Sequence, residues 1–176
     1  MMEKLSWQWM AEHEAGLTQR FNRVERYPAV VRVFQIISRL GDGVFWYCLM
    51  IAMYVFMGKA VLPVILQMIV AGLTATLIYK WLKQKTLRPR PCAQFGQIHC
   101  LTAPLDRFSF PSGHTLHAVT FSLVAIAYYP VLASLLIPFT LAVAISRLVL
   151  GLHYPTDVLA GFVLGGLVAG LSFVVL

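Results

Sequence analysis

The sequence has little charge. Of its 176 residues, 12% are Asp, Glu, Lys or Arg, about half the share of a typical soluble domain, whereas 59% are hydrophobic and the mean hydropathy is +0.75. This composition excludes a soluble globular domain and predicts an all-α, polytopic bundle of transmembrane helices. The length fits a single membrane-embedded domain, residues 1–176, with no second module.

Several further features are scarce or missing. Seven acidic residues face 14 basic ones, and no acidic cluster or metal-spaced set of Cys and carboxylates occurs, so we expect no metal site. The segment Met1 to Leu17 lacks a basic start followed by an apolar run, which argues against a cleavable signal peptide. Only three cysteines are present. Cys92 and Cys100 are near enough in sequence to pair, which remains open, and Cys48 is expected only to pack.

The apolar runs predict five membrane spans. Residues 60–79, 112–129, 131–150 and 155–176 are about long enough to cross a bilayer, and residues 44–57 become so by including residues 40–43. The N-terminal region, residues 1–40, contains no spanning run but mixes arginines with apolar anchors. We expect one or two interfacial helices there.

Two features predict how the last spans pack. Pro130 separates two spans that must form an antiparallel hairpin. The last span carries small residues at a spacing of four that allow close helix packing: Gly161, Gly165, Gly166 and Gly170.

Hydrophilic sequence is concentrated in residues 80–111. The loop holds one acid, Asp106, and six basic residues: Lys80, Lys83, Lys85, Arg88, Arg90 and Arg107. Such an excess of positive charge favours an anionic ligand. For Lys80, Lys85 and Arg88 we expect contact with lipid headgroups at the membrane edge.

A helix is predicted to begin directly after this loop. Ser112 and Gly113 stand at its start, where free backbone N–H groups and the helix dipole favour an oxyanion, and His114 adds a titratable imidazole. Simple helix capping is the alternative. For His117 we expect packing or hydrogen bonding rather than metal ligation.

A third cluster joins the last two spans. Ser146 and Arg147 end one span, and His153 and Asp157 flank Pro155 at the start of the next. Asp157 in the first helical turn can reach back to His153 and leave the other ring nitrogen as a nucleophile. A plain helix cap is again the alternative. Ionisable residues kept in so apolar a chain favour a functional role.

Taken in order, these three clusters resemble the motifs of the type 2 phosphatidic acid phosphatase superfamily. The matching positions are Lys83, Arg90 and Pro91; Pro111, Ser112, Gly113 and His114; and Ser146, Arg147, His153 and Asp157. The resemblance covers residues 83–157 and leaves the N-terminal region outside. Membrane members of this family usually have six spans, against the five expected here.

The resemblance implies a role for each matched residue. His153 would attack phosphorus and form a phosphohistidine, Asp157 would orient it, and His114 would protonate the leaving group and later activate water. The phosphoryl oxygens would be held by Lys83, Arg90, Arg147, the Ser112 hydroxyl and the Gly113 amide. Three cations would do what Mg²⁺ does elsewhere, so no metal and no other cofactor is expected.

The sequence thus predicts an integral membrane lipid phosphatase whose partners are a lipid substrate and the bilayer, without nucleic acid. Phosphatidic acid, phosphatidylglycerol phosphate and a polyprenyl pyrophosphate such as undecaprenyl pyrophosphate all fit, and the oligomeric state is open. A lipid phosphotransferase and a non-catalytic lipid-binding or transport protein are the alternatives. The soluble haloperoxidases of the superfamily are excluded by the spans.

The sequence predicts a multi-pass protein of the cell inner membrane but leaves the face of the site open. Five spans put 13 of the 14 Lys and Arg on the face of the site and only Lys59 opposite, which favours the cytoplasm. Bacterial relatives generally act on the outer face, and a bond between Cys92 and Cys100 would require an oxidising compartment.

Overall fold

The helices follow the apolar runs of the sequence. The computed structural model describes the backbone of residues 2–175 and the side chains of residues 9–175. The helices are α1 (Met2–Asn22), α2 (Pro28–Arg39), α3 (Phe45–Met57), α4 (Leu62–Thr86), α5 (Pro91–Gln94), α6 (Gly113–Tyr128), α7 (Ala133–Val149) and α8 (Pro155–Val175). The fold is 83% helical, and residues 2–175 contain no strand. The all-α class is confirmed.

Each of the five predicted spans contains one helix, namely α3, α4, α6, α7 or α8. Among the residues that the structure describes, three stretches are both long and apolar enough to cross a membrane: Pro28–Thr86, which includes α2 to α4, Pro130–Val149 and Pro155–Val175. Helix α6 has only 16 residues. The number of spans therefore stays a prediction, although the chain is plainly a membrane protein.

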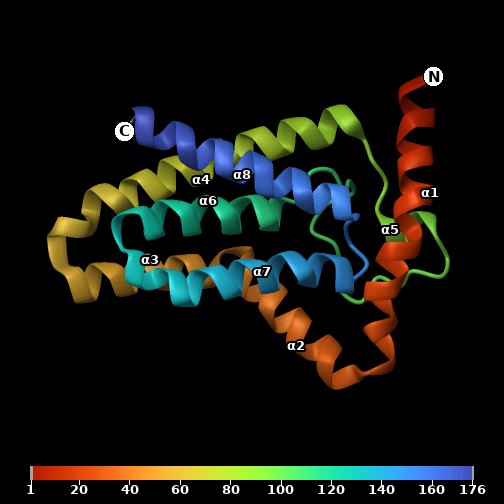
Figure 1. Ribbon diagram of the computed structural model, residues 1–176, viewed down its shortest axis with the longest axis horizontal. Coiled ribbons are helices and arrows are strands. Elements are labelled where there is room, and N and C mark those ends of the chain that lie inside the picture. The colour runs from red at the N-terminus through yellow and green to blue at the C-terminus, as the bar shows by residue number, and fades with distance from the viewer. Residues whose placement is uncertain (1, 176) are drawn as a thin grey trace.

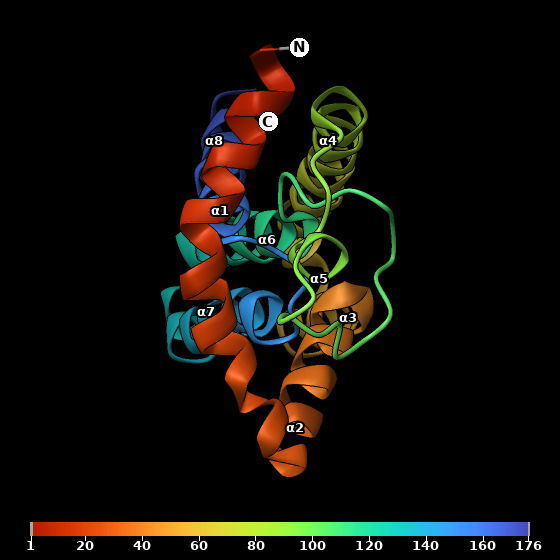
Figure 2. The same cartoon turned by 90° about the vertical axis from the view of Figure 1, so that its right-hand side faces the viewer.

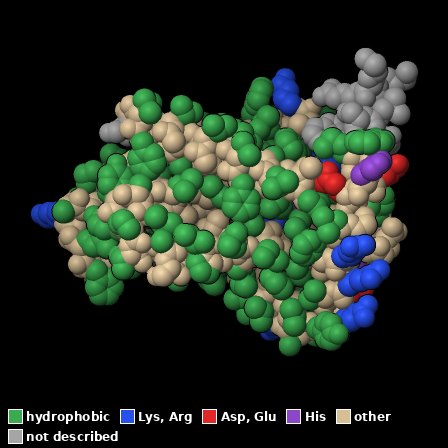
Figure 3. All heavy atoms as spheres, in the orientation of Figure 1, with side chains coloured by type: hydrophobic (Ala, Val, Ile, Leu, Met, Phe, Trp, Pro, Cys, Tyr) green, Lys and Arg blue, Asp and Glu red, His purple; other side chains and the backbone are tan. Residues whose placement is uncertain are grey.

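Helix α6 lies at the centre of the bundle. It packs against α4, α7 and α8, and these helices run along the long axis of the molecule together with α3 (Figures 1 and 2). Buried Trp46, Met68, Val124 and Leu136 belong to the core around it. Large apolar side chains also cover much of the outer surface (Figure 3). Apolar surface on this scale indicates contact with lipid rather than water.

Close packing of α6 against α8 depends on two of the four predicted glycines. A Cβ atom on Gly161 would lie 2.8 Å from the Ser112 carbonyl oxygen, and one on Gly165 would lie 2.7 Å from that of Leu116. Gly166 and Gly170 face open space. Only the first pair therefore acts as predicted, and it holds the start of α8 against the start of α6.

The predicted hairpin is also present, because Pro130–Leu132 forms a short 3-10 turn between α6 and α7. The N-terminal region forms two helices, as expected. Helix α1 crosses one end of the bundle, and α2 leads from it towards α3 (Figure 1). Along α2, Val30, Val33 and Ile36 expose a line of apolar side chains, which suits a helix at the membrane interface.

Candidate active site

The predicted site residues come from separate elements that meet at one end of the bundle. Lys83 lies in the last turn of α4 and Arg147 in the last turn of α7. His114 and Asp157 lie in the first turns of α6 and α8, and His153 lies in the turn before α8. The antiparallel packing of these helices therefore brings the three sequence clusters together.

His153 is 1% exposed, and its two ring nitrogens face different partners. Nδ1 lies 3.5 Å from Asp157 Oδ2, and Nε2 lies 3.2 Å from Arg90 Nη1. Asp157 Oδ2 also accepts a hydrogen bond from the Tyr154 backbone N–H at 2.9 Å. The predicted approach of Asp157 to His153 is present, although 3.5 Å is longer than a usual hydrogen bond.

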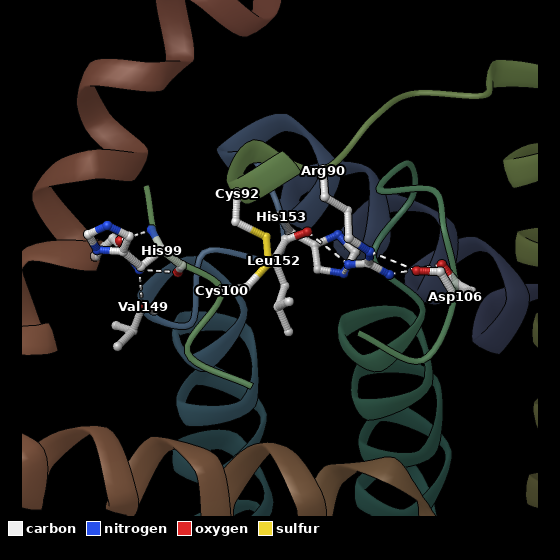
Figure 4. The surroundings of a disulfide bond; sticks show 9 residues. Arg90, Cys92, His99, Cys100, Asp106, Val149, Leu152 and His153 are labelled. Carbon is white, nitrogen blue, oxygen red and sulfur yellow. Dashed lines mark hydrogen bonds and ion pairs between the residues drawn. A yellow bond between two sulfur atoms is a disulfide. The ribbon is translucent and has the colours of Figure 1, made fainter. Parts of the chain in front are cut away.

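Lys83 and Arg90 converge on Asp106, the single acid of the long loop. Lys83 Nζ lies 2.8 and 2.7 Å from the two carboxylate oxygens, and Arg90 Nη2 lies 2.8 Å from Oδ1. Figure 4 shows Arg90 between His153 and Asp106. Both cations are buried, whereas 39% of the Asp106 side chain is exposed. The Asp106 carboxylate thus binds the two cations that the family resemblance assigns to the phosphoryl oxygens.

Burial and nearby charge alter the titration of the loop groups. Burial, with Arg90 and Arg147 next in importance, lowers the pKa of His153 well below its ordinary value. The ring is therefore neutral at neutral pH, as a nucleophile must be. Burial raises the pKa of Asp106, but hydrogen bonding and attraction from Lys83 and Arg90 outweigh it and leave that pKa below its usual range.

Arg147 and His114 lie on the same cavity as these groups. The Arg147 guanidinium is buried and donates a hydrogen bond to the Ser38 hydroxyl of α2. His114 Nε2 lies 3.5 Å from Asp42 Oδ1. Asp42 belongs to the kink between α2 and α3, within residues 40–43, which lengthen the first predicted span.

The start of α6 is only partly as predicted. Gly113 lines the cavity. Ser112 is fully buried, and its hydroxyl lies 2.9 Å from that of Thr115 rather than on the cavity wall. Contact of the Ser112 hydroxyl with a phosphate therefore stays a prediction. His117 makes hydrogen bonds, as expected: Nδ1 donates to the Gly113 carbonyl oxygen at 3.0 Å.

Arg88 was wrongly predicted to touch lipid headgroups. Its side chain is 0% exposed, and Nη1 donates to Asp157 Oδ1 at 2.6 Å and to the Thr156 hydroxyl at 2.8 Å. Glu14 of α1 lies 3.4 Å from Nη2 and accepts the Thr156 hydroxyl at 2.8 Å. The buried carboxylate of Asp157 needs a cation, and Arg88 is that cation. Lys85 is exposed, and its contact with lipid headgroups stays a prediction.

Cys92 and Cys100 form a disulfide beside His153 (Figure 4). The bond joins two cysteines that are eight positions apart, one in α5 and one in the loop that follows it. The Cys92 backbone N–H donates to the Gly151 carbonyl oxygen at 3.3 Å. Cys48, in contrast, is exposed on α3 rather than packed inside the bundle as expected.

A cavity of about 710 Å³ joins the charged groups to an apolar wall. Its charged part contains Lys83, Arg90, His114, Arg147 and His153, and its apolar part contains Trp46, Met50, Ile69, Leu73 and Phe121 of α3, α4 and α6. A second cavity of about 450 Å³ shares His114, Arg147 and Asp42 and extends along α2. The site can thus hold an anionic group next to a hydrocarbon chain.

Known proteins resemble this chain in sequence. The PAP2 superfamily model matches residues 44–176. Phosphatidylglycerophosphatase B of Bacillus subtilis (strain 168) is 33% identical over 178 residues, which cover 89% of this chain and 70% of that protein. Phosphatidylglycerophosphatase B of Haemophilus influenzae is 37% identical over 76 residues, 38% of this chain and 32% of that protein.

The chain belongs to the PAP2 superfamily.

Solved PAP2-like structures agree in fold. Aquifex aeolicus LpxE superimposes with a TM-score of 0.77 at 26% identity, covering 90% of this chain and 93% of that one. The first transmembrane PAP2 type phosphatidylglycerolphosphate phosphatase from Bacillus subtilis superimposes with a TM-score of 0.67 at 26% identity, covering 99% and 96%.

Two acidic residues at the site lie N-terminal to the PAP2 match, which starts at Val44. Glu14 contacts the Arg88 and Thr156 side chains, and Asp42 faces His114. Asp42 was not predicted as a site residue, but one sequence signal could have identified it: it is an ionisable residue between two glycines at the edge of an apolar run. No local signal marks Glu14, since both of its partners belong to distant parts of the sequence.

Proposed function

We propose that this PAP2 protein hydrolyses the phosphomonoester or pyrophosphate of a membrane lipid through a phosphohistidine on His153. The observation that carries the proposal is the cavity of about 710 Å³, whose wall is cationic at one end and apolar at the other. A soluble phosphate would gain nothing from the apolar wall, whereas a lipid phosphate would bury its first acyl or prenyl carbons there. The names of the relatives also support a lipid phosphate.

In the proposed reaction, His153 Nε2 attacks phosphorus, an N–P bond forms and the P–O bond to the lipid breaks. His114 gives its proton to the departing oxygen. Water then attacks the phosphohistidine, His114 takes a proton from that water, and the N–P bond breaks to release phosphate and neutral His153. The buried position of His153 and its lowered pKa support this role, because they keep its ring unprotonated.

Lys83, Arg90 and Arg147 would hold the phosphoryl oxygens, with the Gly113 amide, and stabilise the charge of the five-coordinate phosphorus. In the structure Lys83 and Arg90 bind Asp106. A substrate phosphate would therefore replace the Asp106 carboxylate. The half-exposed position of Asp106 on a loop allows it to move aside.

The three cations support a reaction without a metal ion. We propose also that the site faces an oxidising compartment, because the Cys92–Cys100 disulfide lies directly beside it. The count of basic residues argues for the opposite face, and labelling of the cysteines distinguishes the two.

The proposal is tested by phosphate release from three lipids in detergent micelles: phosphatidic acid, phosphatidylglycerol phosphate and undecaprenyl pyrophosphate. Wild-type protein should turn over at least one of them. His153→Ala should lose turnover by at least about 10⁴-fold, because no nucleophile remains. His99→Ala is the matched control, since that side chain is 58% exposed and its contacts lie outside the cavity.

Each alternative has its own outcome. Release of phosphate by His153→Ala at the wild-type rate would rule out the phosphohistidine. Lipid binding without release by the wild type would indicate a binding or transport protein. Transfer of the phosphoryl group to an added lipid alcohol in preference to water would indicate a phosphotransferase.

A further inference from the structure

A second carboxylate–imidazole contact lies on the cavity that His153 lines. Asp42 Oδ1 is 3.5 Å from His114 Nε2, the same separation as between Asp157 Oδ2 and His153 Nδ1. Both histidines are nearly enclosed, with 11% and 2% of their side chains exposed. The imidazole assigned to proton transfer thus has a carboxylate neighbour, just as the imidazole assigned to attack does.

The backbone between α2 and α3 brings Asp42 to this place. The helical path breaks at Asp42, with φ −82° and ψ 16°, and Gly43 follows at φ +127°, a conformation that favours glycine. A Cβ atom on Gly41 would lie 2.8 Å from Val143 Cγ2, so the kink rests directly on α7. The kink and its packing place the Asp42 carboxylate, whose side chain is 34% exposed, on the walls of both cavities.

No cation holds Asp42 in a salt bridge within the described part of the chain. Arg39 and Arg147 influence it through charge, but the ring that its carboxylate contacts is that of His114. This differs from Asp106 and Asp157, which are each bound directly by Lys or Arg. A charged side chain placed in such apolar sequence without a salt bridge calls for a functional reason.

We propose that Asp42 is a positioning residue for His114, which it orients by accepting a hydrogen bond from Nε2–H. The other nitrogen, Nδ1, has no hydrogen-bond partner among the described residues and is left to serve the departing oxygen. Asp42 also stabilises the imidazolium that gives up the proton, and the 3.5 Å contact shortens when the substrate is bound. This inference rests on the proposed function, in which His114 is the general acid.

The first test compares Asp42→Asn with the wild type on two substrates, dioleoyl phosphatidic acid in micelles and p-nitrophenyl phosphate. An alkoxide needs a proton when it leaves and a nitrophenolate does not. Asp42→Asn should therefore lower kcat about tenfold on the lipid and less than about threefold on the aryl phosphate. The loss on the lipid is smaller than the rate factor of roughly 10²–10⁴ that general acid catalysis itself supplies, because His114 is still present. KM should change little.

Two further variants separate positioning from other effects. Asp42→Glu keeps a carboxylate and should recover part of the lipid kcat, whereas a purely structural role would not distinguish the two replacements in this way. Glu12→Gln removes an exposed negative charge away from the cavity and should behave as wild type. If Asp42→Asn does not purify as a folded protein, Asp42→Ser, which is smaller and also lacks the carboxylate, is measured in its place.

Several results would overturn the proposal. An unchanged kcat on the lipid in Asp42→Asn would do so, and so would an equal loss of kcat on both substrates. A fall in KM as the only change would also do so, because it would show that Asp42 merely repels the phosphate. Failure of wild-type protein to release phosphate from any lipid would instead refute the proposed function, and it is seen before any variant is compared.

Discussion

Replacement of Arg88 by Met should destabilise the protein strongly, although Arg88 lies outside the family's motif positions. The change leaves the Asp157 carboxylate buried without its cation, since Arg88 Nη1 and Asp157 Oδ1 are 2.6 Å apart and both side chains are 0% exposed. Met keeps much of the aliphatic volume, so the loss is mainly electrostatic. It also removes the stacking of the guanidinium over Tyr154, whose ring centre lies 4.1 Å away.

The expected magnitude follows from this burial. Removal of one partner of a buried ion pair costs about 3–5 kcal/mol. For a chain of this size, 1 kcal/mol corresponds to about 2–4 °C in Tm, so the Tm should fall by about 6–20 °C. The double variant Arg88→Met with Asp157→Asn should regain much of this stability, because the buried charge is then absent as well, but it should not regain activity.

The assay is thermal unfolding in detergent, followed by circular dichroism. Lys85→Met is the matched control, because Lys85 is an exposed cation on the neighbouring turn. A Tm for Arg88→Met as high as that of Lys85→Met would refute the reasoning and restore the headgroup role. Failure of the double variant to recover would show that Arg88 stabilises the fold through contacts other than Asp157.

Three further outcomes are expected. The pKa of His153 is lowered, so its reactive neutral form persists on acidification. After correction for the ionisation of the substrate, kcat/KM on p-nitrophenyl phosphate should therefore decline only below about pH 6.5. A decline centred above that pH would contradict the assignment of His153 as nucleophile. EDTA should leave phosphate release unchanged, and its restoration by Mg²⁺ after a loss would show that a metal takes part. A membrane-impermeant maleimide should label Cys92 and Cys100 in intact cells only after reduction; no labelling until the membrane is opened would place the site in the cytoplasm.

The relation between sequence and fold is clearest for the helices of the bundle. Apolar runs of spanning length predict helices because hydrocarbon leaves backbone groups no partners but each other. The ends of these helices, at Pro130 and Pro155 for example, follow from local chemistry. Gly166 and Gly170 show the limit of such reasoning, because the spacing of small residues does not say which side of a helix meets a neighbour.

The site divides in the same way. The sequence alone predicted which residues form the candidate site, because the motif positions Lys83, Arg90, His114, Arg147 and His153 are recognisable by residue type and spacing, and all five line one cavity. Residue type and spacing are local properties of the chain, and the resemblance to the family depends on these two properties alone.

Only the tertiary structure decided which charges are partners. Arg88 with Asp157 and Asp42 with His114 are pairs whose members lie on different elements, far apart along the chain. Asp106 meets Lys83 and Arg90 because the loop between them folds back on itself. No periodicity or local propensity encodes such pairings. Whether an arginine points to a lipid headgroup or to a buried carboxylate depends on how the helices pack, because the energy of a charge is set by the dielectric and the partners that packing provides.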